Sequence, residues 1–93
     1  MPGPLVLVFV QTGCPACGEY MKNFNKIAPA YYRRGIPVQV GDLARGGRSV
    51  QLANQYRIEA TPTTIGITRK GDVIRLEGAV ESKHIQSLFE RLG

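Results

Sequence analysis

Residues 5–17 of the chain read LVLVFVQTGCPAC, and this stretch decides the fold. Its first part, Leu5–Val10, is an unbroken apolar run rich in β-branched residues, which is typical of a strand covered on both faces. Thr12 and Gly13 then favour a turn. Cys14 begins a helix with Pro15 in the first turn, where proline gives up no hydrogen bond by lacking an N–H. The sequence therefore predicts a buried strand that leads into a helix starting at a cysteine.

The two cysteines of the chain, Cys14 and Cys17, both lie at the start of that helix. Free N–H groups and the helix dipole favour an anion at a helix N-terminus. We therefore expect the pKa of the Cys14 thiol to lie below that of a free cysteine. Cys17 follows one helical turn later on the same face, where it can attack a mixed disulfide formed at Cys14. This placement suggests that Cys14 is a nucleophile and Cys17 a resolving thiol.

Two structural roles for the cysteine pair are less favoured. A bridge across so short a loop constrains the unfolded chain little, so it would stabilise the fold little. A tetrahedral zinc site needs four ligands. Beyond Cys14 and Cys17, the chain offers no further cysteine and one histidine, His84, in the last predicted helix. We therefore expect no bound metal.

The segment after the cysteines is predicted to be helical and then extended. Tyr20, Phe24 and Ile27 recur at the spacing of an inward helical face. Pro29 is expected to break or kink this helix, because it lacks the N–H that the helix interior uses. A second strand is predicted at 38–40.

The second half of the chain is predicted to form a loop at 42–47, a short helix, a hairpin and a final helix. Ser49 is a plausible N-cap for the short helix, which would run to Tyr56. Two alternating strands, one around Ile65 and one at 73–77, read as a hairpin. The apolar residues of the last helix stand at helical spacing: Ile85, Leu88, Phe89 and Leu92.

These elements give the order β-α-β-α-β-β-α. The first βαβ unit must be parallel with a right-handed crossover, and the hairpin adds antiparallel strands. We therefore predict an α/β fold with a four-stranded mixed sheet flanked by three helices, in a single domain over residues 1–93.

The charge pattern argues against several classes of partner. The chain carries a formal net charge of +5, from 12 Lys and Arg against 7 Asp and Glu. The basic residues are scattered among acids, with no long basic run and no interleaved aromatics, so nucleic-acid binding is not expected. The run at 5–10 is too short to cross a membrane and lacks a basic leader and a cleavage site. With Met1 as the natural start, we expect a cytoplasmic protein with no membrane partner.

Several further motifs resemble the thioredoxin family. They are the run from Leu5 to Gly18, the Thr61-Pro62 pair, the turn at 70–73 and the Gly78-Ala79 pair. The resemblance implies a minimal thioredoxin fold in which Pro62 is preceded by a cis bond and faces the cysteines. It also implies that the Thr61 backbone pairs with an extended substrate peptide. The remaining implied substrate-binding residues are Gly13, Pro15, Ala16, Pro62, Gly78 and Ala79.

The chain departs from the thioredoxin pattern in four ways. The similarity begins at the family's central strand, so the family's N-terminal strand and helix are missing and the size is that of a glutaredoxin. Gly13 stands where thioredoxins carry tryptophan. Val8 occupies the place of the buried acid that assists the resolving thiol, so Cys17 lacks an internal general base. Pro15 resembles a glutaredoxin residue, but the glutathione-binding glycines of glutaredoxins are absent.

The resemblance implies a small thioredoxin-like reductase of protein disulfides. It would work as a monomer, with a redox-active Cys14–Cys17 disulfide and no bound cofactor. Its electrons would come from thioredoxin reductase or from glutathione. Two alternatives stay open: an oxidase or isomerase of an oxidising compartment, and a binding or assembly module, such as a viral structural component, that uses the unusual 45–48 loop.

Overall fold

The computed structural model describes residues 3–93 and confirms the predicted α/β fold with a four-stranded mixed sheet. Its elements are β1 (Leu5–Val10), α1 (Pro15–Tyr32), β2 (Val38–Asp42), the short 3₁₀ helix η1 (Leu43–Arg45), α2 (Arg48–Gln55), β3 (Thr63–Ile67), β4 (Val73–Glu77) and α3 (Ser82–Leu92). Within residues 3–93, no helix has the length and apolar character that crossing a membrane requires.

The four strands lie in the order β2-β1-β3-β4. β1 runs parallel to β2, with Val6 opposite Val38, and antiparallel to β3, which forms the predicted hairpin with β4. Because parallel strands finish at the same end of a sheet, the residues that follow β1 and β2 come together there. The cysteine pair lies at this end of the sheet.

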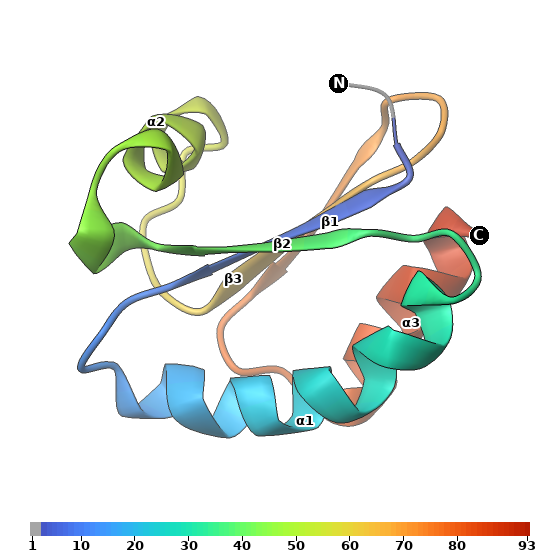
Figure 1. The fold of residues 1–93 in the computed structure, drawn as a ribbon, viewed down its shortest axis with the longest axis horizontal. Helices are drawn as coiled ribbons and strands as arrows, with labels where there is room; N and C mark the ends of the chain where they lie inside the picture. The colour runs from blue at the N-terminus through green and yellow to red at the C-terminus, as the bar shows by residue number, and fades with distance from the viewer. Residues whose placement is uncertain (1–2) are drawn as a thin grey trace.

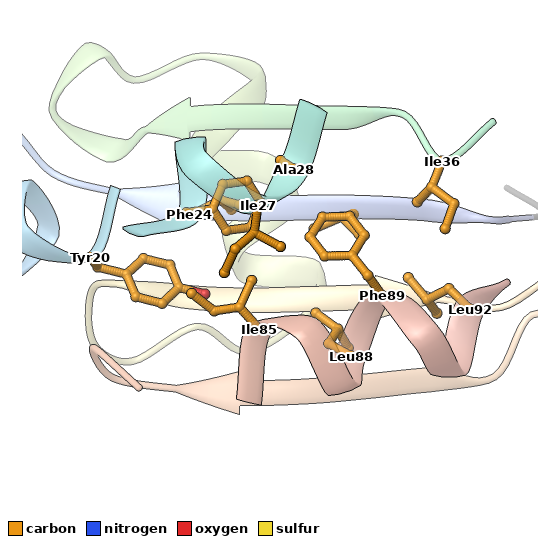
Figure 2. Close-up of a cluster of buried hydrophobic side chains, with 11 residues drawn as sticks. Tyr20, Phe24, Ile27, Ala28, Ile36, Ile85, Leu88, Phe89 and Leu92 are labelled. Atoms are coloured by element: carbon orange, nitrogen blue, oxygen red, sulfur yellow. The ribbon is translucent and has the colours of Figure 1, made fainter. Parts of the chain in front are cut away.

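Helices cover the two faces of the sheet unequally. Figure 1 shows the sheet nearly edge-on, with α1 and α3 on one side and α2 on the other. The core on the α1/α3 face is the larger, and Figure 2 shows its aromatic and aliphatic side chains between the helices and the sheet. Its buried residues are Val6, Val8, Tyr20, Phe24, Ile27, Ala28, Ile36, Ile85, Leu88, Phe89 and Leu92. The core on the α2 face consists of Leu5, Leu7, Phe9, Ala53, Ile65 and Ile67.

Pro29 was expected to break or kink the first helix, and it does not break it, because α1 continues through it to Tyr32. A proline inside a helix removes one backbone hydrogen bond. Packing beyond the proline offsets that loss: the Tyr31 ring stacks on Phe89 of α3 with centroids 4.7 Å apart. The Arg33 N–H also donates to the Pro29 carbonyl at 3.1 Å, which completes the last turn.

The start of the short helix also differs from the prediction. α2 begins at Arg48 after Gly47, which makes no side-chain cap, and Ser49 lies inside the first turn. Ser49 packs against β2 instead, so closely that a Cβ on Gly41 would lie 2.8 Å from its Oγ. The predicted loop at 42–47 is also more ordered than expected, since it contains the end of β2 and η1.

Candidate active site

Cys14 and Cys17 lie at the N-terminus of α1, where the sequence predicts them. Cys14 is the N-cap, with φ −97° and ψ 105°, and Pro15 follows as a first-turn residue. The two sulfur atoms lie at disulfide distance, with Cα atoms 5.3 Å apart. Cys14 is half-buried, whereas Cys17 is 5% exposed and belongs to the core. Gly13 has φ +88°, a left-handed conformation that glycine adopts without strain.

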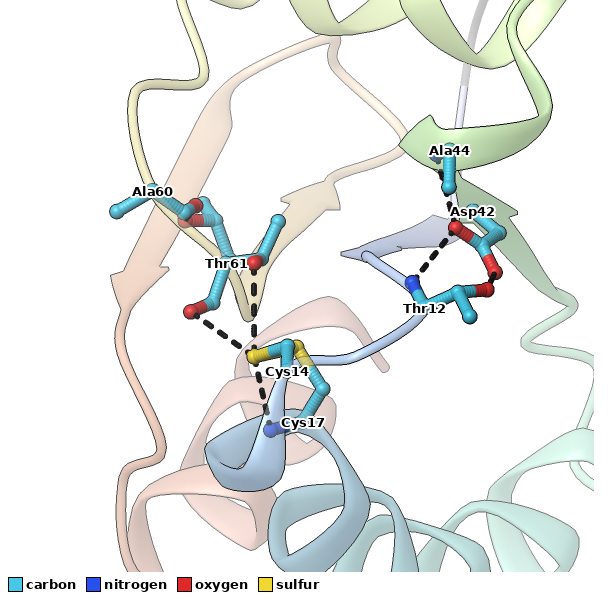
Figure 3. The surroundings of a disulfide bond; sticks show 8 residues. Thr12, Cys14, Cys17, Asp42, Ala44, Ala60 and Thr61 are labelled. Atoms are coloured by element: carbon cyan, nitrogen blue, oxygen red, sulfur yellow. Dashed lines mark hydrogen bonds between the residues drawn. A yellow bond between two sulfur atoms is a disulfide. The ribbon is translucent and has the colours of Figure 1, made fainter.

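The Cys14 sulfur has hydrogen-bond donors on two sides (Figure 3). The Cys17 N–H donates to it at 3.2 Å, and the Thr61 hydroxyl donates to it at 3.6 Å. The Thr61 carbonyl oxygen is 3.7 Å from the same sulfur. Donors directed at a sulfur favour its negatively charged form, as does the helix N-terminus. Of the two cysteines, Cys14 is therefore the one whose surroundings favour the thiolate form.

The loop that carries Thr61 is fixed by backbone and hydroxyl contacts. The Thr61–Pro62 peptide bond is cis, and the Pro62 side chain is fully buried. Gly78, just after β4, donates its N–H to the Pro62 carbonyl at 2.8 Å. The Thr63 hydroxyl donates to the Ala60 carbonyl at 2.7 Å. These contacts place Thr61 beside Cys14 although the two residues are 47 apart in sequence.

Arg75 of β4 anchors the segment that precedes this loop. Its guanidinium donates to the carbonyl oxygens of Tyr56 and Arg57 at 2.6 and 2.7 Å. Arg57 has φ +54°, so the chain turns sharply where α2 ends. A guanidinium that binds the last carbonyls of a helix acts as a C-terminal cap. Arg75 therefore fixes where the chain leaves α2 towards Thr61.

Asp42, the last residue of β2, ties the end of that strand to the cysteine loop. Its carboxylate accepts hydrogen bonds from the Thr12 N–H and hydroxyl and from the Ala44 N–H (Figure 3). The Thr12 hydroxyl, the Ala44 N–H and the nearby Arg45 charge together lower the pKa of Asp42 below its ordinary value. This carboxylate therefore holds Thr12, two residues before Cys14, against the end of β2.

Val8 is fully buried on β1 and stands directly opposite Thr64 of β3. The Tyr20 hydroxyl forms a buried hydrogen bond with the Thr64 hydroxyl. Burial raises the pKa of Tyr20, although the bond to Thr64 opposes this shift. At neutral pH the buried polar groups here are therefore two uncharged hydroxyls, and no carboxylate occupies the position of Val8.

The structure brings together most, but not all, of the residues that the sequence indicates. Thr61 contacts Cys14, and Gly78 contacts Pro62. Ala79 is exposed and joins none of the hydrogen bonds described above. Gly13, Pro15 and Ala16 surround the cysteines and are exposed, so a substrate can reach them.

Three contributors were missed from sequence: the Thr61 side chain, expected to act through its backbone, Asp42 and Arg75. A signal for Asp42 exists, because polar residues follow two strands predicted to be parallel, and such strands finish at the same edge. Within residues 3–93, no group of three or more His, Cys, Asp or Glu side chains is arranged to hold a metal ion.

The sequence and the fold of this chain are both similar to those of known proteins. A sequence profile described as a thioredoxin-like domain matches residues 2–93. Mitochondrial thioredoxin 3 of Saccharomyces cerevisiae is 23% identical, with a TM-score of 0.75 over 95% of this chain and 77% of its own. Thioredoxin-2 of the malaria parasite is 24% identical, with a TM-score of 0.78 over 94% and 81%. The thioredoxin of Fasciola hepatica is 19% identical, with a TM-score of 0.78 over 96% and 80%. A search of curated protein sequences finds no match.

Proposed function

Because this chain belongs to the thioredoxin-like family, we propose that it is a thiol–disulfide oxidoreductase that reduces protein disulfides. The family fold and a cysteine pair at disulfide distance support a redox function of this general kind. The finer assignment depends on one observation: the Cys14 sulfur accepts hydrogen bonds from the Cys17 N–H and the Thr61 hydroxyl at the N-terminus of α1. An arrangement of this kind favours a reactive thiolate.

The exchange proceeds in two steps that transfer two electrons to the substrate. The Cys14 thiolate attacks one sulfur of a substrate disulfide, so that a Cys14–substrate bond forms and the other substrate sulfur leaves as a thiolate. Cys17, after losing its proton, then attacks the Cys14 sulfur. The Cys14–Cys17 disulfide forms, and the second substrate thiolate leaves. Protons from solvent complete the two substrate thiols.

The buried position of Cys17 supports a role for it in the second step. It is 5% exposed, so a bulky substrate reaches Cys14 first. With valine at position 8 instead of the buried acid that thioredoxins carry there, Cys17 must pass its proton to water or to the departing substrate thiolate. We expect the second step to be slow, and a mixed disulfide with substrate to persist longer than a buried base would allow.

The resulting disulfide must be reduced again by an external donor. In this proposal the donor is either a flavin-dependent thioredoxin reductase or two molecules of glutathione, which become glutathione disulfide. The setting is one where thiols are kept reduced, as in the cytoplasm, and the active species is the monomer.

The proposal is tested by insulin reduction, measured with thioredoxin reductase and NADPH and, separately, with glutathione and glutathione reductase. We expect turnover with at least one donor, and none for Cys14→Ser. The matched variant Cys17→Ser should accumulate a mixed disulfide with insulin, visible on a non-reducing gel. If wild type is inactive with both donors, the proposal fails in favour of a binding module. If Cys14→Ser retains activity, Cys14 is not the nucleophile and the proposed mechanism fails.

The contribution of the Thr61 hydroxyl is tested by Thr61→Val, which keeps the side-chain shape but removes the donor to Cys14. Hydrogen bonds to charged groups are the stronger ones, so we expect a higher Cys14 pKa and several-fold slower alkylation at pH 7 by iodoacetamide. Thr61→Ser restores a hydroxyl and should return the pH profile towards that of wild type. Identical profiles for all three proteins would remove Thr61 from the mechanism.

A further inference from the structure

The two edges of the sheet are protected to different degrees. β4 forms one edge and carries the exposed charges of Arg75 and Glu77, which is how many proteins prevent strand pairing at an edge. β2 forms the other edge and carries one charged side chain, Asp42 at its end, which is already bonded to Thr12 and Ala44. The β2 edge therefore lacks the usual protection.

The outward backbone groups of β2 can be identified from its pairing with β1. The Val6 N–H donates to the Pro37 carbonyl at 3.0 Å. In a parallel ladder every second residue directs its N–H and C=O to one neighbour. Gln39 and Gly41 consequently face β1, whereas Val38 and Val40 direct their N–H and C=O groups away from the sheet. These outward groups can pair with an added strand.

Hollows lie along both faces of this edge. On the α1 side is a groove of about 300 Å³, lined mostly by apolar residues, where Tyr32 and Val40 are 66% and 53% exposed. Its lining is Phe24, Asn25, Ala28, Pro29, Tyr32, Arg33, Val38 and Val40. On the α2 side is a smaller hollow of about 210 Å³, which includes Gln39, Gly41, Arg48 and Ser49 in its lining. A strand added beside β2 would have a site for its side chains on either face.

The charged side chains that line these hollows are all positive. Arg33 borders the groove on the α1 side, and Arg48 borders the hollow on the α2 side. No Asp or Glu lines either hollow, and among residues 3–93 neither arginine has an acidic partner within ion-pair distance. The edge of β2 is therefore an apolar and cationic surface.

We propose that the β2 edge binds an extended acidic segment of a partner protein, which adds to the sheet as a fifth strand. Main-chain hydrogen bonds to Val38 and Val40 would provide affinity, and alternate side chains would provide specificity. Apolar side chains of the segment would enter the groove beside Tyr32, and acidic side chains would face Arg48. The preferred segment therefore alternates apolar and acidic residues.

Charge also decides against a second copy of this chain as the occupant. Two copies that pair through β2 would bring together their arginines from the same edge, and each copy carries a net charge of +5. Like charges placed side by side oppose association. An acidic segment removes that repulsion. The site does not include Cys14 or Cys17, so it is independent of the proposed redox chemistry.

The experiment titrates ¹⁵N-labelled protein with the capped peptide Glu-Val-Glu-Val-Glu-Val-Glu and follows the amide signals. We expect saturable shifts centred on Val38 and Val40, with the same Kd for the Cys14→Ser/Cys17→Ser variant. Three matched peptides should fail to bind: one with the valines grouped together, one with lysine for glutamate, and one N-methylated at alternate residues. Equal binding of any of these peptides, or shifts centred elsewhere, would overturn the proposal.

Variants of the protein test the same surface. Val40→Pro removes an outward N–H, a change that an edge strand tolerates, and should abolish binding while the spectrum stays that of a folded protein. Arg48→Gln should weaken binding about two- to fivefold, the size expected for one exposed charge pair. Arg69→Gln, an equal loss of charge at the turn between β3 and β4, should have no effect. Equal effects of the two arginine variants, or dimers in sedimentation equilibrium without peptide, would refute the acidic-segment proposal.

Discussion

The two faces of the sheet are covered by layers of different thickness. On the α1/α3 face, two helices of 18 and 11 residues pack on the strands and on each other, and Phe89 contacts the rings of both Phe24 and Tyr31. On the other face, the 8-residue α2 contributes one buried residue, Ala53. The thick layer contains Cys17 and the start of α1, whereas both layers border the open β2 edge. The cysteine pair thus lies on the face with the larger core, and the proposed binding edge lies between the two layers.

The largest expected difference between the faces is in the free energy of unfolding that is lost on large-to-small substitutions in their helices. Phe89→Ala should lower the free energy of unfolding by about 3–5 kcal/mol, since it opens a cavity between α1 and α3. Leu52→Ala on α2 should cost about 1 kcal/mol, because Leu52 is half-buried. Urea denaturation followed by circular dichroism measures both, and Phe89→Leu replaces Phe89→Ala if the latter does not fold. Equal losses would contradict the contrast between the layers.

Two glycines allow a matched comparison of how far each layer can move. A Cβ on Gly66 would lie 2.7 Å from Leu88 Cδ1, and a Cβ on Gly41 would lie 2.8 Å from Ser49 Oγ. Gly66→Ala must push aside the side-chain ends of Leu88 and Leu92 in a closely packed core and should cost about 1–3 kcal/mol, as overpacking does. Gly41→Ala meets the start of a thin, partly exposed layer and should cost less than about 1 kcal/mol. Thermal unfolding of both variants ranks them, and the reverse order would show that α2 is the more rigid layer.

A smaller loss of stability is expected from the buried hydroxyl pair of Tyr20 and Thr64 on the thick face. Tyr20→Phe leaves the Thr64 hydroxyl buried without its partner, and we expect a loss of about 1–2 kcal/mol. The double variant Tyr20→Phe/Thr64→Val removes both groups, and it should be more stable than Tyr20→Phe alone, because no buried hydroxyl is left unpaired. Equilibrium denaturation of the single and double variants tests this. If the double variant is the less stable of the two, Thr64 has another partner.

The sequence predicts the parts of this molecule that have a local signal. The apolar run at 5–10, the hairpin and the last helix are each set by periodicity within one segment, and all three are confirmed. The location of the cysteines at a helix start is confirmed for the same reason, since turn and proline residues surround them.

The features that sequence reasoning missed depend on residues far apart in the chain. The continuation of α1 past Pro29 depends on stacking of Tyr31 against Phe89, which outweighs a local breaking signal. The contact of Thr61 with Cys14 spans 47 residues, and that of Thr12 with Asp42 spans 30. The Thr61–Cys14 contact becomes visible only when the strand order is known, whereas the parallel pairing predicted for the first two strands already indicates that Thr12 and Asp42 lie close together.

The smallest expected effect is on the pH dependence of stability. It concerns two exposed carboxylates, one on each side of the molecule. Asp42 bonds to Thr12 and Ala44 near the thin layer, and Glu90 of α3 accepts from the Tyr31 hydroxyl and Arg34 of the thick layer. The Thr12 hydroxyl first and the Ala44 N–H next lower the pKa of Asp42. The Tyr31 hydroxyl is the main cause of the lowered pKa of Glu90.

Because both pKa values are lower in the folded state, both groups stabilise the fold above their unfolded values, and this contribution is lost as the pH falls through the folded values. Asp42→Asn and Glu90→Gln should therefore each flatten the decline in stability below about pH 4, with little change in the pH dependence between pH 6 and 8. The two effects should be additive, because the carboxylates share no hydrogen-bond partner. Urea unfolding between pH 2 and 7 at low salt measures the slopes. A steeper acid decline in either variant would mean that its carboxylate opposes folding, and a non-additive double variant would show that the two layers are coupled through the sheet.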